Sequence, residues 1–372
     1  MTISRSFITG IFVMMVFTSG CWQGFKLALE KPLWTDEIYS QLSSVQGKSW
    51  SEIWTGKIKE GNNSPIFYSV QKLICAVTGW HSDFLWQKQE RRDRVVMRFA
   101  PVVCMSAGLA IIVGYFTAVY SMIGGLVAFV LCVTSFMVWT FWAEARPYAM
   151  MFTMSAIQAL LIFQYYRKEN VRVLWGLGVV NIVLAFLSSL SVIQIFASGL
   201  VIALKGCCRI WLLALTVGIP LAIAFFYYSR ADHYSFWFAS HGLPLSLIKA
   251  NMSSERLVAF FVIPCLIWVW DRRSGASGTP AFLSLVVWAW LTFLGYCLLL
   301  GVLWIKQNPP EGFEISNRYF MTLTSVGIVA VAAGIMELLQ RPRSVLAVCM
   351  VWGVILLVIA PRLVKTLHWM GL

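Results

Sequence analysis

The stretch MRFAPVVCMSAGLAIIVGYFTAV, residues 97–119, carries a single charged residue, Arg98, and is long enough to cross a membrane as one helix. Apolar runs of this kind recur along the whole chain, and within them polarity does not alternate. Continuous runs of about 16 to 24 residues are typical of membrane helices, whereas the strands of membrane barrels alternate apolar and polar residues. The sequence therefore predicts an all-α polytopic membrane protein.

The composition excludes an ordinary soluble domain. Of the 372 residues, 59% are hydrophobic and 12% are charged, and the mean hydropathy is +0.75, whereas a soluble domain carries about 25% charged residues. The 18 Trp, 25 Phe and 12 Tyr residues fit aromatic belts at the membrane surfaces. The net charge of +13 comes from short basic clusters between apolar runs. This pattern favours anionic membrane lipid as the partner and argues against nucleic acid.

The apolar runs predict about eleven transmembrane helices in one transmembrane domain, residues 1–372, with no separate soluble C-terminal domain. The run 66–80 would be about 22 Å long as a helix, too short to span comfortably, so we expect an interfacial helix there. It belongs to the longest hydrophilic segment, 30–96, which we predict to be a first periplasmic loop with juxtamembrane helices. The predicted spans are 6–28, 97–119, 123–141, 147–165, 173–187, 189–204, 210–228, 256–270, 281–304, 319–338 and 344–361.

The basic residues predict the orientation. If 66–80 does not span and the N-terminus is cytoplasmic, four short basic loops lie on the cytoplasmic side, as the positive-inside rule requires. Arg91, Arg92, Arg94 and Arg98 then lie outside, in a long loop of the kind that is largely exempt from the rule. If 66–80 does span, the same loops lie outside. We favour the first arrangement, which places the segments 30–96, 142–146, 229–255 and 305–318 on one non-cytoplasmic face. The four basic loops contain Arg167-Lys168-Arg172, Lys205-Arg209, Arg272-Arg273 and Arg341-Arg343.

Two adjacent acids, Asp36 and Glu37, follow the first predicted helix in the run Trp34-Thr35-Asp36-Glu37. A carboxylate at the edge of a low-dielectric region is a stronger proton acceptor than one in water. A general base needs such a position together with access to the substrate. The alternative is a solvated helix cap that follows Thr35.

Three other polar positions could belong to a site. Glu144 and Arg146 lie between two apolar runs with almost no loop, where they would either line a polar cavity or form a buried pair that orients two helices. Arg318, beside Tyr319, could bind phosphate through two parallel hydrogen bonds, or could be a snorkelling residue of the membrane surface. Asn63 precedes Ser64-Pro65, which by itself indicates a turn before a helix.

Metal chemistry has no support in the sequence. The four His residues lack ligand spacing, and the nine Cys residues include no CxxC pair. We therefore expect no metal site and no required cofactor, although a divalent metal remains compatible with the sequence.

Taken together, these motifs resemble those of the C-type (GT-C) glycosyltransferase superfamily, specifically the bacterial relatives of protein O-mannosyltransferases and of the aminoarabinose transferase that modifies lipid A. The resemblance covers most of residues 1–165 and becomes diffuse after about residue 205. The motifs that carry it are Trp34-Thr35-Asp36-Glu37, Ser64-Pro65-Ile66-Phe67-Tyr68, Arg98-Phe99-Ala100-Pro101, Glu144-Ala145-Arg146-Pro147-Tyr148-Ala149 and Arg318-Tyr319.

The resemblance implies a GT-C fold and an inverting transfer of a sugar from a polyprenyl-phosphate donor. The transfer would take place on the periplasmic face of a bacterial inner membrane, to an envelope lipid, glycan or protein acceptor. Asp36 would be the catalytic base with Glu37 beside it, and Arg318 would be a candidate for the donor phosphate. The substrate-binding residues would be Asn63, Glu144, Arg146, Tyr148, Arg318 and Tyr319.

The chain departs from the family pattern at three points. Many relatives have His-Pro-Pro where this chain has Asn63-Ser64-Pro65, and many have a His-Tyr pair where it has Ser188-Ser189-Leu190-Ser191. The large C-terminal periplasmic domain of some members is also missing. These departures bear on the acceptor more than on the reaction. Two other functions stay open: a transporter or flippase of lipid-linked sugars, although we find neither an inverted repeat nor a broken helix in the sequence, and a non-catalytic subunit of an envelope polysaccharide complex.

Overall fold

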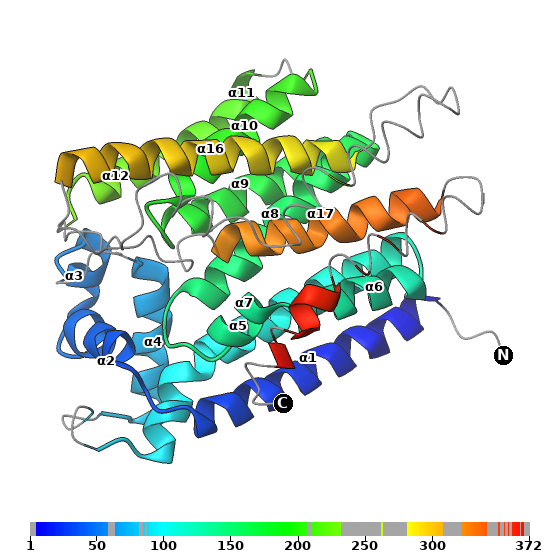
Figure 1. Cartoon of the computed structure of the whole chain (residues 1–372). Helices are drawn as coiled ribbons and strands as arrows, with labels where there is room; N and C mark the ends of the chain where they lie inside the picture. Colours follow the sequence, from blue (N-terminus) through cyan, green and yellow to red (C-terminus); the bar gives the residue numbers. More distant parts are fainter. Residues whose placement is uncertain are drawn as a thin grey trace.

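The structure, a computed structural model, is helical throughout the part of the chain that it describes and contains no strand there (Figure 1). The all-α prediction is therefore confirmed. The described residues are 5–58, 64–81, 85, 88–206, 210–231, 262, 281–307 and 321–340, with separate residues between 349 and 367. The elements are α1 (Arg5–Glu30), α2 (Thr35–Ser40), the π-helical turn η1 (Gln41–Val45), α3 (Trp50–Thr55), α4 (Pro65–Thr78), α5 (Arg91–Val119), α6 (Met122–Val133), α7 (Phe136–Phe141), α8 (Tyr148–Lys168), α9 (Val171–Ala185), α10 (Ser191–Leu204), α11 (Ile210–Leu213), the π-helical turn η2 (Ala214–Gly218), α12 (Ile219–Tyr228), α16 (Phe282–Gln307) and α17 (Met321–Leu339).

Among the described residues, six helical segments are long and apolar enough to cross a membrane, which agrees with a membrane-spanning protein. Five of them begin and end within a few residues of predicted spans, and Arg91–Val119 begins earlier because its first turns carry the charged residues that precede residue 97. The predicted spans 256–270 and 344–361 lie almost entirely outside the described residues. The six segments are Ser6–Glu30, Arg91–Val119, Tyr148–Lys168, Ile210–Tyr228, Phe282–Leu299 and Met321–Leu339.

The prediction of one continuous span at 123–141 is wrong, because the chain divides there into α6 and α7. The Thr134 hydroxyl donates to the carbonyl oxygen of Val130 at 2.7 Å, and the indole nitrogen of Trp139 donates to the carbonyl oxygen of Val133 at 2.6 Å. Side chains that bond to nearby backbone groups give the backbone an alternative to the helical ladder. The helix is interrupted at Thr134-Ser135, where the Trp139 indole takes up the Val133 carbonyl oxygen.

The segments α9 and α10 divide at Ser188, as the sequence predicts, but have only 15 and 14 residues. Each is therefore about 21–23 Å long, shorter than the hydrocarbon core of a bilayer. The count of eleven spans stays a prediction for this reason.

The segment predicted as interfacial is the helix α4, which has 14 residues. It begins with Pro65 at its first position and ends at Gly79, whose φ of 59° lies in the left-handed region that favours glycine. Phe67 and Tyr68 are buried on one side, whereas Val77 is exposed. Together with α2 and α3, α4 lies at one end of the helical bundle (Figure 1), as expected for juxtamembrane helices.

The basic residues described between α8 and α10 gather at the opposite end. The Arg167 guanidinium lies 5.0 Å from the centre of the Tyr120 ring, and Tyr120 ends α5. The Lys205 ammonium lies 2.8 Å from the Glu169 carboxylate. Arg98, near the start of α5, contacts α2, whereas Tyr120 follows the last residue of α5. The contacts of Arg167 with Tyr120 therefore lie at the far end of α5 from α2. The bundle thus has one end that carries Arg167 and Lys205 and an opposite end that carries α2–α4 together with the arginines at the start of α5.

A buried polar network joins four helices in the interior. Gln158 of α8 donates to Asn181 of α9 at 2.7 Å, and Gln194 of α10 donates to Gln158 at 2.9 Å. The Tyr296 hydroxyl of α16 donates to the Gln194 side-chain oxygen at 3.2 Å. Hydrogen bonds of this kind hold helices together where there is no hydrophobic driving force between them. The network therefore fixes the packing of α8, α9, α10 and α16.

Close packing of α1 on α5 gives the first testable prediction. A Cβ atom at Gly24 would lie 2.7 Å from Val102 Cγ1 and 2.9 Å from Trp142 Nε1, whereas one at Gly10 would meet nothing within 4 Å. We expect Gly24→Val to lower the free energy of unfolding by about 1–3 kcal/mol through overpacking, and Gly10→Val on the same helix to leave it unchanged. Thermal unfolding of the purified variants in detergent tests this. Equal melting temperatures for the two variants would show that α1 does not pack on α5 in this way.

Candidate active site

The adjacent acids Asp36 and Glu37 take up different positions at the start of α2. The chain leaves α1 at Glu30 and enters α2 at Thr35, after Trp34 in an extended conformation. The Glu37 side chain folds back and accepts the Trp34 backbone N–H at 3.1 Å, which satisfies a donor at the helix N-terminus. Glu37 is fully buried and Asp36 is half-buried.

Glu37 forms a buried ion pair with Arg98 of α5. Arg98 Nε lies 2.9 Å from Glu37 Oε1, and Arg98 Nη2 lies 2.6 Å from Glu37 Oε2. The backbone N–H of Ala145, in the turn before α8, donates to Glu37 Oε1 at 2.6 Å. With the Trp34 N–H, the carboxylate accepts four hydrogen bonds, which is about its full capacity. This geometry favours a structural role for Glu37 over the catalytic role expected beside Asp36.

The Arg98 guanidinium also caps the C-terminal end of α1 by donating to backbone carbonyl oxygens there. Nη1 donates to the carbonyl oxygens of Ala28 at 3.1 Å and Lys31 at 2.6 Å, and Nη2 donates to that of Pro32 at 2.8 Å. All five N–H groups of the side chain are thus used within the protein. Arg98 therefore ties α1, α2 and α5 together at one point. The sequence signal for this role is its position as the single charge in an apolar run, where a charge must find partners.

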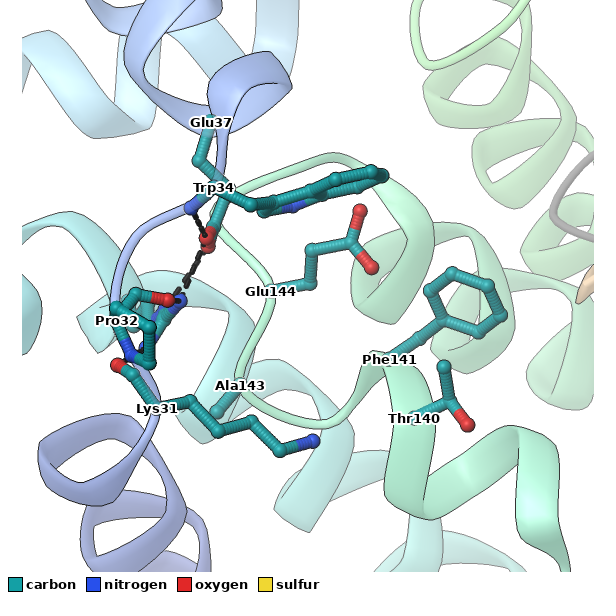
Figure 2. A pocket seen from close by; sticks show the side chains of 9 residues that line it. Lys31, Pro32, Trp34, Glu37, Thr140, Phe141, Ala143 and Glu144 are labelled. Atoms are coloured by element: carbon teal, nitrogen blue, oxygen red, sulfur yellow. Dashed lines mark hydrogen bonds and ion pairs between the residues drawn. The ribbon is translucent and has the colours of Figure 1, made fainter.

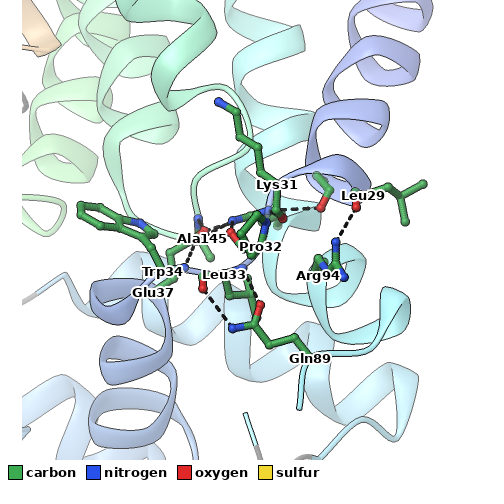
Figure 3. Close-up of polar contacts among 11 residues, drawn as sticks. Leu29, Lys31, Pro32, Leu33, Trp34, Glu37, Gln89, Arg94 and Ala145 are labelled. Atoms are coloured by element: carbon green, nitrogen blue, oxygen red, sulfur yellow. Dashed lines mark hydrogen bonds and ion pairs between the residues drawn. The ribbon is translucent and has the colours of Figure 1, made fainter. Parts of the chain in front are cut away.

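Residues just before and within the first turn of α5 hold the linker between α1 and α2 (Figure 3). The Gln89 side chain accepts the Leu33 N–H at 2.6 Å and donates to the Leu33 carbonyl at 3.0 Å. Arg94 Nη1 donates to the carbonyl oxygen of Leu29 at 2.7 Å. The backbone of residues 29–33 is therefore fixed by side chains from outside it.

The turn between α7 and α8 brings Glu144 and Arg146 to α2. Both side chains are 8% exposed, and the Arg146 N–H donates to the Glu144 carbonyl oxygen at 2.7 Å. Arg146 Nη1 donates to the Ser40 hydroxyl and, at 3.4 Å, to the carbonyl oxygen of Asp36. The fold thus places this turn beside α2 and holds Arg146 against it.

Tyr148, the other expected binding residue that the structure describes, packs in the core. Tyr148 is 1% exposed and packs edge-on against Phe141, with ring centres 5.1 Å apart. This favours a packing role for Tyr148 over the expected binding role. Asn63, Arg318 and Tyr319 lie outside the described residues.

A cavity of about 640 Å³ opens where these elements meet (Figure 2). The Glu144 carboxylate lies between Trp34 and Phe141 in this view. Asp36 is not among the lining residues, although Trp34 and Glu37 on either side of it are. The lining residues are Lys31, Pro32, Trp34, Glu37, Arg98, Thr140, Phe141, Ala143 and Glu144.

Lys31 lines the cavity, although no pattern in the sequence singles it out. Burial and the charge of Arg98 lower the pKa of Lys31 from 10.5 to about 8, and Glu144 and Glu37 act in the opposite direction. The Lys31 ammonium therefore loses its proton closer to neutral pH than an ordinary lysine does. The sequence carries no signal for this because both causes, burial and the nearby guanidinium, arise only in the folded chain.

Within the described part of the chain, no three His, Cys, Asp or Glu side chains are grouped so that they could hold a metal ion. The cavity combines two cations, two carboxylates and aromatic side chains at one end of the bundle. Comparison of the chain with protein-family models, curated proteins and solved structures gives no match. The chemistry of the cavity and the motifs that surround it therefore carry the functional argument.

Proposed function

We propose that this protein is a membrane glycosyltransferase of the GT-C type that transfers a sugar from a polyprenyl-phosphate donor to a lipid, glycan or protein acceptor. One observation carries the proposal. Glu37 of the first motif contacts Arg98 of the third motif and Ala145 of the fourth, beside a single cavity at one end of the bundle. Motifs up to 108 residues apart in the chain thus meet at one point.

In the proposed reaction, Asp36 takes a proton from an acceptor hydroxyl while that oxygen attacks the anomeric carbon of the donor. The bond between the anomeric carbon and the phosphate oxygen breaks, and the lipid phosphate leaves with both bonding electrons. Displacement in one step predicts inversion at the anomeric carbon. Cationic side chains near the cavity stabilise the charge of the leaving phosphate. Arg318 is the residue that the family resemblance suggests for this, and it lies outside the described residues.

The proposal includes a topology of about eleven spans in a bacterial inner membrane. The ends of α8 and α10, with Arg167 and Lys205, would face the cytoplasm according to the positive-inside rule. The cavity, at the other end of the bundle, would then face the periplasm. A donor with its tail in the outer leaflet could enter the cavity from that side.

A transporter of lipid-linked sugars is the second candidate. The interruption between α6 and α7 favours it, because transporters build binding sites from discontinuous helices. At this interruption the indole nitrogen of Trp139 already donates to the carbonyl oxygen of Val133, so that oxygen is bonded within the protein. The site near Glu144 lies beyond it, at the end of the bundle, which favours chemistry at the membrane face.

The proposal is tested by incubating the purified protein with radiolabelled polyprenyl-phosphate sugars and extracted envelope lipids and glycans. We expect label to move from the donor to an acceptor, with an inverted anomeric configuration in the product. Donor binding without any transfer would favour the transporter. Absence of donor binding by folded protein would contradict both candidates.

A further inference from the structure

The cavity contains four charged side chains, two of which neutralise each other. Glu37 and Arg98 form the buried ion pair, and every N–H of Arg98 is used within the protein. Arg98 therefore has no donor left for a ligand. The second cation that lines the cavity is Lys31, and the second carboxylate is Glu144.

We infer that Lys31 binds the phosphate group of a lipid-linked ligand in this cavity. The inference rests on the proposed function for the identity of the ligand as a prenyl phosphate. Lys31 directly follows Glu30, the last residue of a segment long and apolar enough to cross the membrane. This is the level at which the tail of an amphiphile ends and its headgroup begins. A lysine ammonium is a compact charge that suits phosphate.

The backbone of Lys31 is fixed, which sets the point from which its side chain enters the cavity. Its carbonyl oxygen accepts Arg98 Nη1 at 2.6 Å, and its N–H donates to the Leu27 carbonyl oxygen at 3.1 Å. Figure 2 shows the Lys31 side chain running beneath Ala143, while the Glu144 carboxylate lies between Trp34 and Phe141. The carboxylate repels an anion, so a phosphate occupies the side of the cavity near Lys31. The hydroxyl-bearing part of the ligand then occupies the side near Glu144.

The pKa of Lys31 makes the inference sensitive to pH. The charged groups around Lys31 are Arg98 from α5, Glu37 from α2 and Glu144 from the turn before α8, and together with burial they give a pKa of about 8. Below that pH the ammonium is charged and attracts phosphate, and above it the charge is lost. A phosphate monoester has its second pKa at about 6, so its own charge is constant at higher pH. Affinity is therefore expected to fall as the pH rises from about 7.5 to about 9.5, the range that brackets this pKa.

The test measures binding of farnesyl phosphate and of farnesol to the full-length protein in nanodiscs of neutral phosphatidylcholine. We expect Lys31→Met to weaken binding of farnesyl phosphate by about tenfold or more and to leave farnesol unaffected. The matched control is Lys26→Met in the last turns of α1, where the ammonium is exposed and lies 3.9 Å from Glu30. This control is expected to bind as the wild type does. Lys31→Arg is expected to bind farnesyl phosphate without the loss at high pH, because arginine stays protonated.

The possible results of this test bear differently on the inference about Lys31 and on the proposed function. Wild-type affinity for farnesyl phosphate in Lys31→Met overturns the inference and leaves the proposed function standing. A wild-type protein that does not distinguish farnesyl phosphate from farnesol overturns both. If Lys31→Met does not fold, a flat pH profile of the wild type across the same pH range overturns the inference. Inorganic phosphate is expected not to displace farnesyl phosphate at equal concentration, and displacement would show that the site binds a free anion and not a lipid headgroup.

Discussion

Replacement of Asp36 by Asn is expected to reduce the rate of sugar transfer by about a hundred- to ten-thousandfold, the range that a general base contributes. The amide keeps the size of the carboxylate but does not take up a proton. The backbone carbonyl oxygen of Asp36 accepts Arg146 Nη1 at 3.4 Å, and the substitution leaves that hydrogen bond in place. Because Asn keeps the shape of the side chain, we expect the variant to fold and to bind the donor. The transfer assay with the purified variant measures the rate.

Two further variants test whether the loss of transfer rate is specific to Asp36. Glu30→Gln changes an exposed acid at the end of α1 and is expected to transfer sugar at the wild-type rate. Glu144→Gln changes a carboxylate that lines the cavity, whereas the Asp36 carboxylate does not line it. A near-normal rate for Asp36→Asn together with a large loss for Glu144→Gln would assign the base to Glu144. A near-normal rate for both would contradict base catalysis by either acid.

Replacement of Arg98 by Met is expected to lower the free energy of unfolding by about 3–5 kcal/mol, the cost of removing one partner of a buried ion pair. The Glu37 carboxylate, which is fully buried, would lose its two charge-assisted hydrogen bonds. Three carbonyl oxygens between Ala28 and Pro32 would lose their donor as well. Since these contacts position α2, transfer activity is expected to fall along with stability. Thermal unfolding in detergent gives the change in stability.

Arg94→Met is the matched control, because Arg94 lies one turn earlier on α5 and donates to a single carbonyl oxygen, that of Leu29. Its expected cost is about 1 kcal/mol. The double variant Arg98→Met with Glu37→Gln is expected to lose less free energy of unfolding than the sum of the losses in the two single variants, because no unpaired charge is left buried. Strictly additive effects would show that Glu37 and Arg98 do not interact.

The class of the protein followed from local features of the sequence. Segments such as 97–119 have no way to bury their apolar surface in a soluble domain of this composition, and a helix satisfies their backbone within the segment itself. The short helix Pro65–Thr78 was predictable from its apolar run together with Pro65 and Gly79 at its two ends. The break between α6 and α7 was missed, because an apolar run gives little warning that the Trp139 indole will take up the Val133 carbonyl oxygen.

The roles of the site residues depended on tertiary structure. Asp36 and Glu37 look equivalent in the sequence, but neighbouring residues on a helix point about 100° apart, and the fold buries only the second of them against Arg98. The partners of Glu37 lie 61 and 108 residues away in the chain. The lowered pKa of Lys31 likewise needs burial and the nearby Arg98. Sequence by itself determined that the chain is helical and apolar enough to span a membrane, since both are local properties. The fold decided that Glu37 pairs with Arg98 and that Lys31 and Glu144 also line the cavity. Burial and pairing between distant residues exist only once the helices pack.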